Sequence, residues 1–390
     1  MQGHVEKKRG RYYVVLELER DVRTGQRKRK WVGGFAKKKE ADAALIEHVY
    51  RSNAGTCVSP SKRTVANFME EWLQTLKPTV RPSTWECYRM NSQTRIAPLL
   101  GAIELRRLGA VDLNRAYAVL LESGRADGKG GLSPRSVRLV HVTIHRALRD
   151  AVRWGLLARN VGDLADPPKH IKTEMNTWKA EEVHRFLDHV RADRLYPCFL
   201  LLLTTGLRRG ELAGLRWEDV DFDARRISIR RSRVVVGYGN VVVSDPKTSR
   251  GRRVLPLDVV VVEALRAHRA RQLQERLALG AGYEGDGQTL FTHENGKSMH
   301  PDQISYAFEK AASAGGLPRI RLHDLRHTYA TLALQAGVPL WAVSDILGHA
   351  SIAITSDVYR HSIPAMLEEA AGTVAELMLR KQGGVDSPRP

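Results

Sequence analysis

The chain has 390 residues, of which 43% are hydrophobic and 27% are charged, as is ordinary for a folded protein, and this length predicts about two to three domains. No stretch is long and apolar enough to span a bilayer, since the longest candidate, residues 199–203, is a short core run. Lys and Arg number 62 against 43 Asp and Glu, a net charge of +19, which favours DNA or RNA as a partner over a membrane surface, although a solvated basic surface would also produce it.

Neither the first residues nor the cysteines indicate secretion. The first residues, Met-Gln-Gly-His-Val-Glu-Lys-Lys-Arg, contain no apolar core of a signal peptide, so we expect the protein to stay in the cytoplasm. Cys57, Cys87 and Cys198 have neither zinc-site spacing nor a disulfide framework, and we interpret them as reduced structural residues.

Residues 1–57 predict a small basic domain. Residues 11–19 alternate as a strand does, and a turn at residues 23–26 leads into a second strand that ends at Gly33-Gly34. Residues 38–50 have the spacing of an amphipathic helix. The second strand begins with four basic residues that would contact phosphates, Arg27, Lys28, Arg29 and Lys30.

Residues 58–63 look like a linker, and residues 64–165 are helical in pattern. Thr64 and Ser133 are expected to cap two of the helices, with Pro134 in the first position of its helix, and further helices open near Pro82 and Val111. Residues 124–131 form a glycine-rich loop. In the last helix a set of residues at helical spacings either lines DNA or forms a solvated face: Arg135, Arg138, His141 and Arg146.

Residues 175–380 predict a third, mostly helical domain with one strand-rich interruption, and residues 381–390 a disordered tail. Residues 226–230 and then 234–236 and 241–243, with a turn at residues 237–240, have the pattern of a hairpin. With a third strand at residues 252–256, after a loop at residues 246–251, they would form a three-stranded sheet. The predicted fold class is therefore multidomain and mainly α with small β-sheets (α+β).

Six residues of this domain, scattered along the sequence, supply what attack on a phosphodiester needs. Planar arginine forks match the charge that builds on the non-bridging oxygens, a lysine can protonate the leaving oxygen, and histidines and a tyrosine can exchange protons. The residues are Arg208 in Thr-Gly-Leu-Arg-Arg-Gly-Glu-Leu, Lys247 in Asp-Pro-Lys-Thr, His323 and Arg326 in His-Asp-Leu-Arg-His-Thr, His349 in Leu-Gly-His, and Tyr359.

In this order and these contexts the residues resemble the tyrosine recombinases, the phage integrase family. The resemblance implies an arm-type DNA-binding domain in residues 1–57, a helical core-binding (SAM-like) domain in residues 64–165 and a catalytic domain in residues 175–380. It also implies a role for each residue: Arg208 and Arg326 clamp the phosphate, Lys247 is the general acid, His323 and His349 donate hydrogen bonds or accept a proton, and Tyr359 is the nucleophile. Glu211 and His327 would be supporting residues.

The same residue types also allow other interpretations. His323 and His327 stand four apart, as metal ligands on a helix do, but no glutamate follows the first histidine and no third ligand is evident, so no metal or other cofactor is expected. Arg209, adjacent to Arg208, would point elsewhere on its helix. Tyr306 and Tyr329 are the rival nucleophiles, and Tyr329 lies on an apolar helix that favours a place in the core.

The activity that the resemblance implies is site-specific recombination. Four protomers on two DNA attachment sites would exchange strands through a 3′-phosphotyrosyl link and a Holliday junction, without ATP, to integrate or excise a phage or mobile element. An amphipathic segment at residues 365–379 would dock on a neighbouring protomer or pack on its own domain. A host DNA-bending protein and an excisionase are implied as partners. The alternatives are a chromosome- or plasmid-resolving recombinase, a type IB topoisomerase and a DNA-binding regulator without catalysis.

Overall fold

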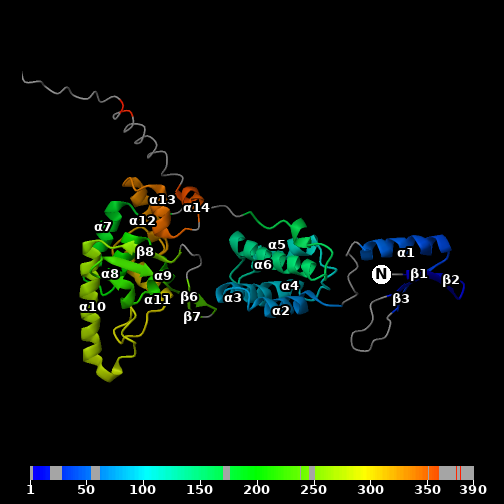
Figure 1. Cartoon of the computed structure of the whole chain (residues 1–390), viewed down its shortest axis with the longest axis horizontal. Helices are drawn as coiled ribbons and strands as arrows, with labels where there is room; N and C mark the ends of the chain where they lie inside the picture. The colour runs from blue at the N-terminus through cyan, green and yellow to red at the C-terminus, as the bar shows by residue number, and fades with distance from the viewer. Residues whose placement is uncertain are drawn as a thin grey trace, which may run out of the picture. The chain divides into compact units, whose positions relative to one another are not determined.

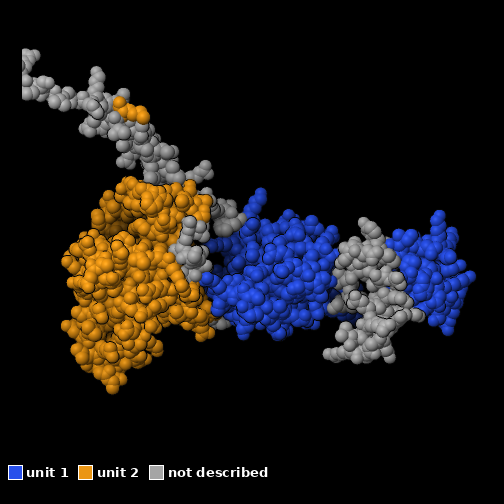
Figure 2. Space-filling model, in the orientation of Figure 1, with its two compact units in different colours: residues 1–172 blue, residues 173–390 orange. Residues whose placement is uncertain are grey.

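The computed structural model of the chain describes residues 3–17, 29–53, 62–169, 176–237, 239–245, 251–349, 351–359, 375 and 378. It divides into two compact units, residues 1–172 and 173–390, coloured separately in Figure 2. Helices dominate and the sheets are small and antiparallel (Figure 1), which confirms the predicted α+β class.

Several expectations fall on residues outside this description. They concern Arg27 and Lys28, Cys57, most of the predicted linker, the lysine loop with Lys247, nearly all of residues 365–379, and the tail at residues 381–390. Arg29, Lys30 and Tyr359 are described in their backbone but not in their side chains.

The N-terminal segment forms an antiparallel sheet in the order β1 (Gly3–Lys8), β2 (Arg11–Glu17) and β3 (Arg29–Phe35). Helix α1 (Lys38–Asn53) packs on it over a core that includes Val14 and Leu16. The expected strand end at Gly33-Gly34 was wrong: β3 continues through the pair, because Tyr13 is opposite Gly33 and Tyr12 opposite Phe35, leaving Gly34 as a bulge. Their φ angles of +98° and +147° explain why glycines occupy this bulge.

A helical bundle follows in residues 62–169. The predicted caps are confirmed, since Thr64 accepts from the amide of Asn67 at 3.3 Å and Ser133 accepts from the amide of Ser136 at 3.2 Å. The core includes the apolar side of its longest helix, α6 (Pro134–Arg153), where buried residues recur every three or four positions, as at Val137, Val140, Ile144 and Leu148. The helices are α2 (Val65–Leu76), α3 (Pro82–Asn91) with a π-helical turn at Ser92–Ile96, α4 (Ala97–Leu100), α5 (Ala110–Ser123) and α6 (Pro134–Arg153).

The second unit is built around a buried apolar helix, α8 (Tyr196–Thr205). Phe199 of this helix packs with three other aromatic rings, those of Trp178, Phe186 and Phe308, with neighbouring centroids 5.1–6.1 Å apart. The other helices are α7 (Ala180–His189), α9 (Arg209–Ala213), α10 (Val259–Leu279), α11 (Pro301–Ala314), α12 (Asp324–Gln335), α13 (Leu340–Leu347) and α14 (Ile352–Tyr359).

The strands of this unit pair differently from the expectation. The hairpin forms a two-stranded sheet of its own from β6 (Ser232–Val236) and β7 (Asn240–Ser244). The three-stranded sheet instead contains β4 (Val220–Asp221), β5 (Arg226–Ile229) and β8 (Arg253–Pro256). One face of that sheet is buried in the core through Ile227, Ile229 and Leu255. The side chains of the hairpin are half-buried or exposed, so the two sheets differ in whether they have a face in the core.

Two further findings concern the described residues alone. Within them no helix has both the length and the apolar character needed to cross a membrane. Cys87 and Cys198 form no disulfide in that part of the chain, and Cys198 is completely buried.

Candidate active site

Arg208 stands at the junction of two helices. Helix α8 ends at Thr205, Gly206 takes a left-handed conformation with φ +61°, and Arg208 precedes the first residue of α9. The side chain of Arg208 is 39% exposed, enough to meet a ligand from outside. The sequence expectation of a helix end and a tight turn before this arginine is confirmed.

Glu211 holds Arg208 in place from three residues further along the chain, about one helical turn away. Its carboxylate accepts from the Arg208 backbone amide at 3.1 Å and from its guanidinium at 2.7 Å, so the side chain both caps α9 and orients the arginine. Glu211 is buried, with 4% of its side chain exposed. Burial acts to raise its pKa, but the hydrogen bond from Arg253 and the charges of Arg253 and Arg208 outweigh it and hold the pKa below its ordinary value.

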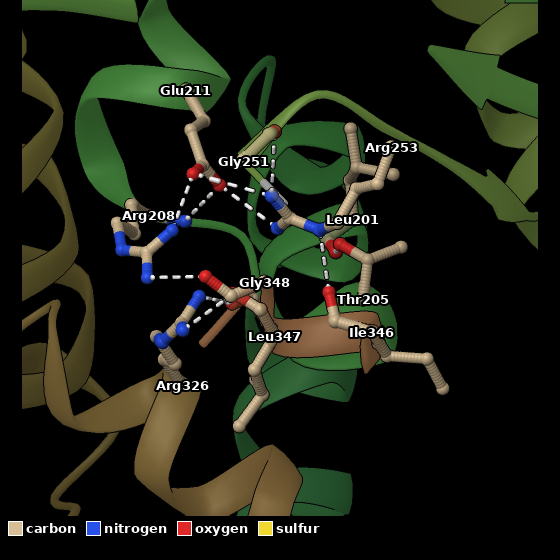
Figure 3. A network of polar contacts seen from close by, with 11 residues as sticks. Leu201, Thr205, Arg208, Glu211, Gly251, Arg253, Arg326, Ile346, Leu347 and Gly348 are labelled. Carbon is tan, nitrogen blue, oxygen red and sulfur yellow. Dashed lines mark hydrogen bonds and ion pairs between the residues drawn. The ribbon is translucent and has the colours of Figure 1, made fainter. Parts of the chain in front are cut away.

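Arg326 approaches the same place from α12, which packs against α8. It is only 3% exposed, and it donates to the carbonyl of Gly206 at 2.9 Å and to that of Leu347 at 2.6 Å. Arg208 donates to the next carbonyl, that of Gly348, at 3.2 Å. Figure 3 shows the two guanidinium groups converging on the end of α13.

His349 follows that end directly. Gly348 turns the chain with a left-handed φ of +64°, and His349 Nδ1 lies 2.7 Å from the hydroxyl of Thr355 on α14. Burial of the ring, and then the positive charges of Arg326 and Arg208, lower the pKa of His349 to about 4. The imidazole is therefore neutral at pH 7, able to accept a proton.

His323 directly precedes the first residue of α12, and hydrogen bonds hold the next residue, Asp324, in place. The carboxylate of Asp324 accepts from the Arg321 amide at 2.8 Å and from its guanidinium at 2.7 Å and 3.0 Å. The ring of His327 lies edge-on to that of His323, with centroids 5.2 Å apart. Partial burial, then the nearby His327 and Arg326, lower the pKa of His323, although its side chain keeps solvent access.

Four of the six predicted residues are therefore described in detail, and the contacts join two of them, Arg208 and Arg326, at one helix end next to His349. Tyr359 is the last residue of α14, four positions after Thr355, and the position of its side chain lies outside the description. Lys247 lies outside it too, although the strands on either side, β7 and β8, are described.

The residues set aside in the sequence have other environments. Arg209 points to α11, where it donates to Asp302 at 2.6 Å and to Ser305 at 3.1 Å. Tyr329 is partly buried against the small cluster around Leu334 and Leu347, and burial raises the pKa of its hydroxyl. Tyr306 is 70% exposed on α11.

The candidate DNA contacts on α6 divide into two kinds. Arg135 and Arg138 are exposed. His141 is half-buried, and its Nδ1 lies 2.8 Å from the Tyr117 hydroxyl. Arg146 packs over the ring of Tyr88, 5.6 Å from its centroid, and donates to that residue's hydroxyl at 3.3 Å. The exposed arginines are thus the better placed of the four for phosphates.

One residue of this cluster, Arg253 at the start of β8, was missed in the sequence. Its guanidinium donates to Glu211 at 2.9 Å and 3.3 Å, and to the carbonyl of Ile346 at 2.6 Å, and only 8% of the side chain is exposed. A signal existed: Arg253 alternates with Leu255 and Leu257, both buried, so it occupies the inward-facing register of a strand.

No group of three His, Cys, Asp or Glu side chains that could hold a metal ion occurs in the described part of the chain. Two guanidinium groups at one helix end, beside a histidine that is neutral at pH 7, suit the binding of a phosphate group whose charge increases during a reaction.

Three family models match consecutive parts of the chain. They are an Arm DNA-binding domain at residues 4–49, a phage integrase N-terminal SAM-like domain at residues 64–120 and the phage integrase family at residues 176–366. An integrase of Streptomyces ambofaciens is 30% identical over 388 residues, covering 94% of both chains. A XerC-like tyrosine recombinase of Caldanaerobacter subterraneus subsp. tengcongensis is 29% identical over 387 residues, covering 94% of this chain and 96% of its own.

Solved structures agree in fold. An integrase of transposon Tn1549 in complex with transposon right-end DNA has a TM-score of 0.65 at 22% identity, covering 79% of this chain and 99% of its own. A lambda integrase, solved as a tetramer bound to a Holliday junction, has a TM-score of 0.54 at 18% identity, covering 90% and 92%. The fold, the order of the matched domains and the full-length identity to an integrase lead to one conclusion: the chain belongs to the phage integrase family of tyrosine recombinases.

Proposed function

We propose that the protein is a site-specific DNA recombinase that cuts and rejoins strands through Tyr359. The tyrosine oxygen attacks a backbone phosphorus, a 3′-phosphotyrosyl bond forms, and the bond to the 5′ oxygen breaks. That oxygen takes a proton and leaves as a hydroxyl. A 5′ hydroxyl of the partner duplex then attacks the phosphotyrosyl bond, rejoins the strand and releases the tyrosine, so no external energy source is consumed.

The observation that carries this proposal is the convergence of Arg208, Arg326 and His349 on one helix end. Their positions in the sequence are far apart, yet Arg208 and Arg326 donate to the successive carbonyls of Gly348 and Leu347, and His349 follows directly. Helix α14, which ends at Tyr359, is tied to His349 through Thr355. A phosphate bound by the two arginines would thus lie near the helix that carries the nucleophile.

Each remaining residue has a proposed role. His349 or His323 accepts the phenolic proton or donates a hydrogen bond to the phosphate, and both have lowered pKa values that keep them neutral beforehand. Lys247 is the general acid for the 5′ oxygen. Glu211 supports Arg208 through its direct hydrogen bonds, and His327 supports His323 through their ring contact. No metal or other cofactor takes part in this scheme.

The biological role we infer is integration or excision of a phage or other mobile element by a tetramer. The arm-domain match at residues 4–49 and the likeness to a transposon integrase support a role in the movement of such an element. The lambda integrase tetramer supports assembly of four protomers. Residues 1–57, 64–165 and 175–380 would bind arm-type sites, bind core sites and catalyse, respectively. The XerC-like relative favours a second candidate, resolution of chromosome or plasmid multimers.

The test is a search for the covalent intermediate. Supercoiled DNA carrying the native locus is incubated with the full chain in EDTA, and detergent-resistant adducts are collected for the wild type and for Tyr359→Phe. We expect a wild-type adduct with a free 5′ hydroxyl and none in the variant. Sequenced break points next to an integrated element favour integration, and break points at a replication-terminus or plasmid site favour resolution.

Tight DNA binding without an adduct, when the host's DNA-bending proteins are supplied, would refute the catalytic proposal. It would leave a DNA-binding regulator as the better explanation. Relaxation of the supercoils without any exchange between two sites would instead indicate a topoisomerase.

A further inference from the structure

Arg253 has the contacts of a residue that organises the candidate site without reaching the DNA. Its side chain is 8% exposed and the Glu211 side chain 4%, so the pair is buried almost completely. A buried charge is costly unless it is paired and hydrogen-bonded, and Arg253 fulfils this condition through the Glu211 carboxylate and two backbone carbonyls, those of Gly251 and Ile346.

The partners of Arg253 come from three separate segments. Glu211 belongs to α9, Ile346 to α13, and Gly251 to the residues that lead into β8. In Figure 3 the Arg253 guanidinium lies on the opposite side of the Glu211 carboxylate from Arg208. A planar fork can satisfy several acceptors in fixed directions at once, which the single ammonium of a lysine cannot do.

Glu211 is the link between the two arginines. Its Oε1 accepts from Arg208 at 2.7 Å and from Arg253 at 3.3 Å, while its Oε2 accepts from the Arg208 amide at 3.1 Å and from Arg253 at 2.9 Å. With Arg253 present, the carboxylate is held from behind and presents a fixed edge to Arg208. Without Arg253, a buried carboxylate would keep Arg208 as its charged partner and could turn toward it.

The second link runs through the end of α13. Arg253 donates to Ile346, Arg326 to Leu347 and Arg208 to Gly348, so three arginines hold three successive carbonyls. His349 is the next residue. The position of this helix end therefore depends on Arg253 as well as on the two arginines that we assign to the phosphate.

We propose that Arg253 is a positioning residue for strand cleavage: through Glu211 and the end of α13 it fixes the direction of the Arg208 guanidinium toward the scissile phosphate. This inference rests on the proposed function, because it concerns the arginine clamp of that reaction. Loss of Arg253 should lower the rate constant of cleavage, while DNA affinity, which depends on many phosphate contacts, changes little.

The experiment measures single-turnover cleavage by the full chain on a nicked duplex of its crossover site, together with DNA affinity and melting temperature. The variant is Arg253→Gln. The matched control is Arg194→Gln, because Arg194 also pairs with a partly buried glutamate, Glu275, through two contacts of 2.7 Å, and also donates to a carbonyl, that of Thr292. None of the control's partners belongs to the cluster around Glu211.

We expect both variants to lose thermal stability. A loss of fold lowers the amplitude of cleavage, whereas misdirection of Arg208 lowers the rate constant by about a hundredfold. Only Arg253→Gln should show the lower rate constant. The double variant Glu211→Gln, Arg253→Gln removes the buried carboxylate that has lost one of its two arginine partners, so it should recover part of the lost melting temperature but not the rate constant.

A wild-type rate constant in Arg253→Gln, or an equal loss in Arg194→Gln, would overturn the assignment. Crystal structures of the wild type and of Arg253→Gln separate this failure from that of the proposed function. Should the wild type form no adduct, the proposed reaction fails, and the structures still decide the positioning role: Arg208 must leave the Gly348 carbonyl in the variant, and an unchanged contact refutes it.

Discussion

A buried arginine such as Arg326 needs acceptors in place of water, and the ends of two helices supply them. The last carbonyls of an α-helix have no partner within the helix and carry the negative end of its dipole. Arg326 donates to Gly206, just after α8, and to Leu347, at the end of α13. The protein thus holds a cation in place in its interior, and under the proposed function the site would need little reorganisation to receive a phosphate.

The histidines make stability depend on pH in a defined direction. His349 has an ordinary pKa of 6.5 and a folded-state pKa of about 4, so below pH 6.5 the unfolded chain binds a proton that the folded chain does not. The contribution of His349 to the free energy of unfolding therefore falls as the pH drops from 6.5 toward 4. His268, buried in the core and also with a pKa of about 4, acts in the same window.

We expect His349→Asn to make the free energy of unfolding depend less steeply on pH. The slope should change by less than about 1.4 kcal/mol per pH unit, the value for one full proton, because solvent screens the half-buried ring. Urea unfolding of both proteins at several pH values between 4 and 7 measures it. The control is His4→Asn, an exposed histidine of the N-terminal sheet. Equal slopes for His349→Asn and the wild type would show that the ring is protonated normally in the folded chain.

At the scale of elements, glycine turns decide where the arginines lie. Gly206 ends α8 and Gly348 ends α13, both with left-handed φ angles, of +61° and +64°. Gly206 also has no room for a side chain, since a Cβ there would lie 2.7 Å from both Leu347 and Tyr329. The turn before Arg208 is therefore packed directly against the helix end that accepts its hydrogen bond.

Gly206→Ala should destabilise the protein by about 2–4 kcal/mol, from the left-handed backbone and the clash together. Gly337→Ala is the matched control, because Gly337 has φ +79° with nothing within 4 Å of the added Cβ, and only the backbone cost of about 1–2 kcal/mol applies. Denaturant unfolding measures both. Equal losses in the two variants would mean that α8 and α13 are not in close contact at this turn.

For the whole molecule, the net charge of +19 should govern the affinity for DNA that the proposed function requires. Neutralised phosphates release counterions, so affinity of the full chain for any duplex should fall by about 10³-fold or more between about 50 and 200 mM salt. Fluorescence anisotropy with an unrelated duplex measures this sequence-independent part. A nearly flat salt dependence would mean that the basic excess lies away from the DNA.

Much of the fold could be predicted because its signals are local. The capping side chains of Thr64 and Ser133 mark the starts of their helices, and the hairpin at residues 232–244 is marked by two runs of three valines around a glycine turn. The missed strands lack such signals: β1 is largely exposed and polar, and β4 has two residues. Their formation depends on neighbouring strands that offer hydrogen bonds, which sequence spacing does not reveal.

By itself the sequence determined the types of residue available for the chemistry, since motifs such as His-Asp-Leu-Arg-His and Leu-Gly-His can be read directly along the chain. Only the tertiary structure decided which of them meet. Contacts between Arg208 and Gly348, and between Arg253 and Glu211, join residues 140 and 42 positions apart, and both depend on how α8, α9, β8 and α13 pack. Packing of this kind is a collective result of burial, so Arg253 acquired its partners from the fold and not from its neighbours in the sequence.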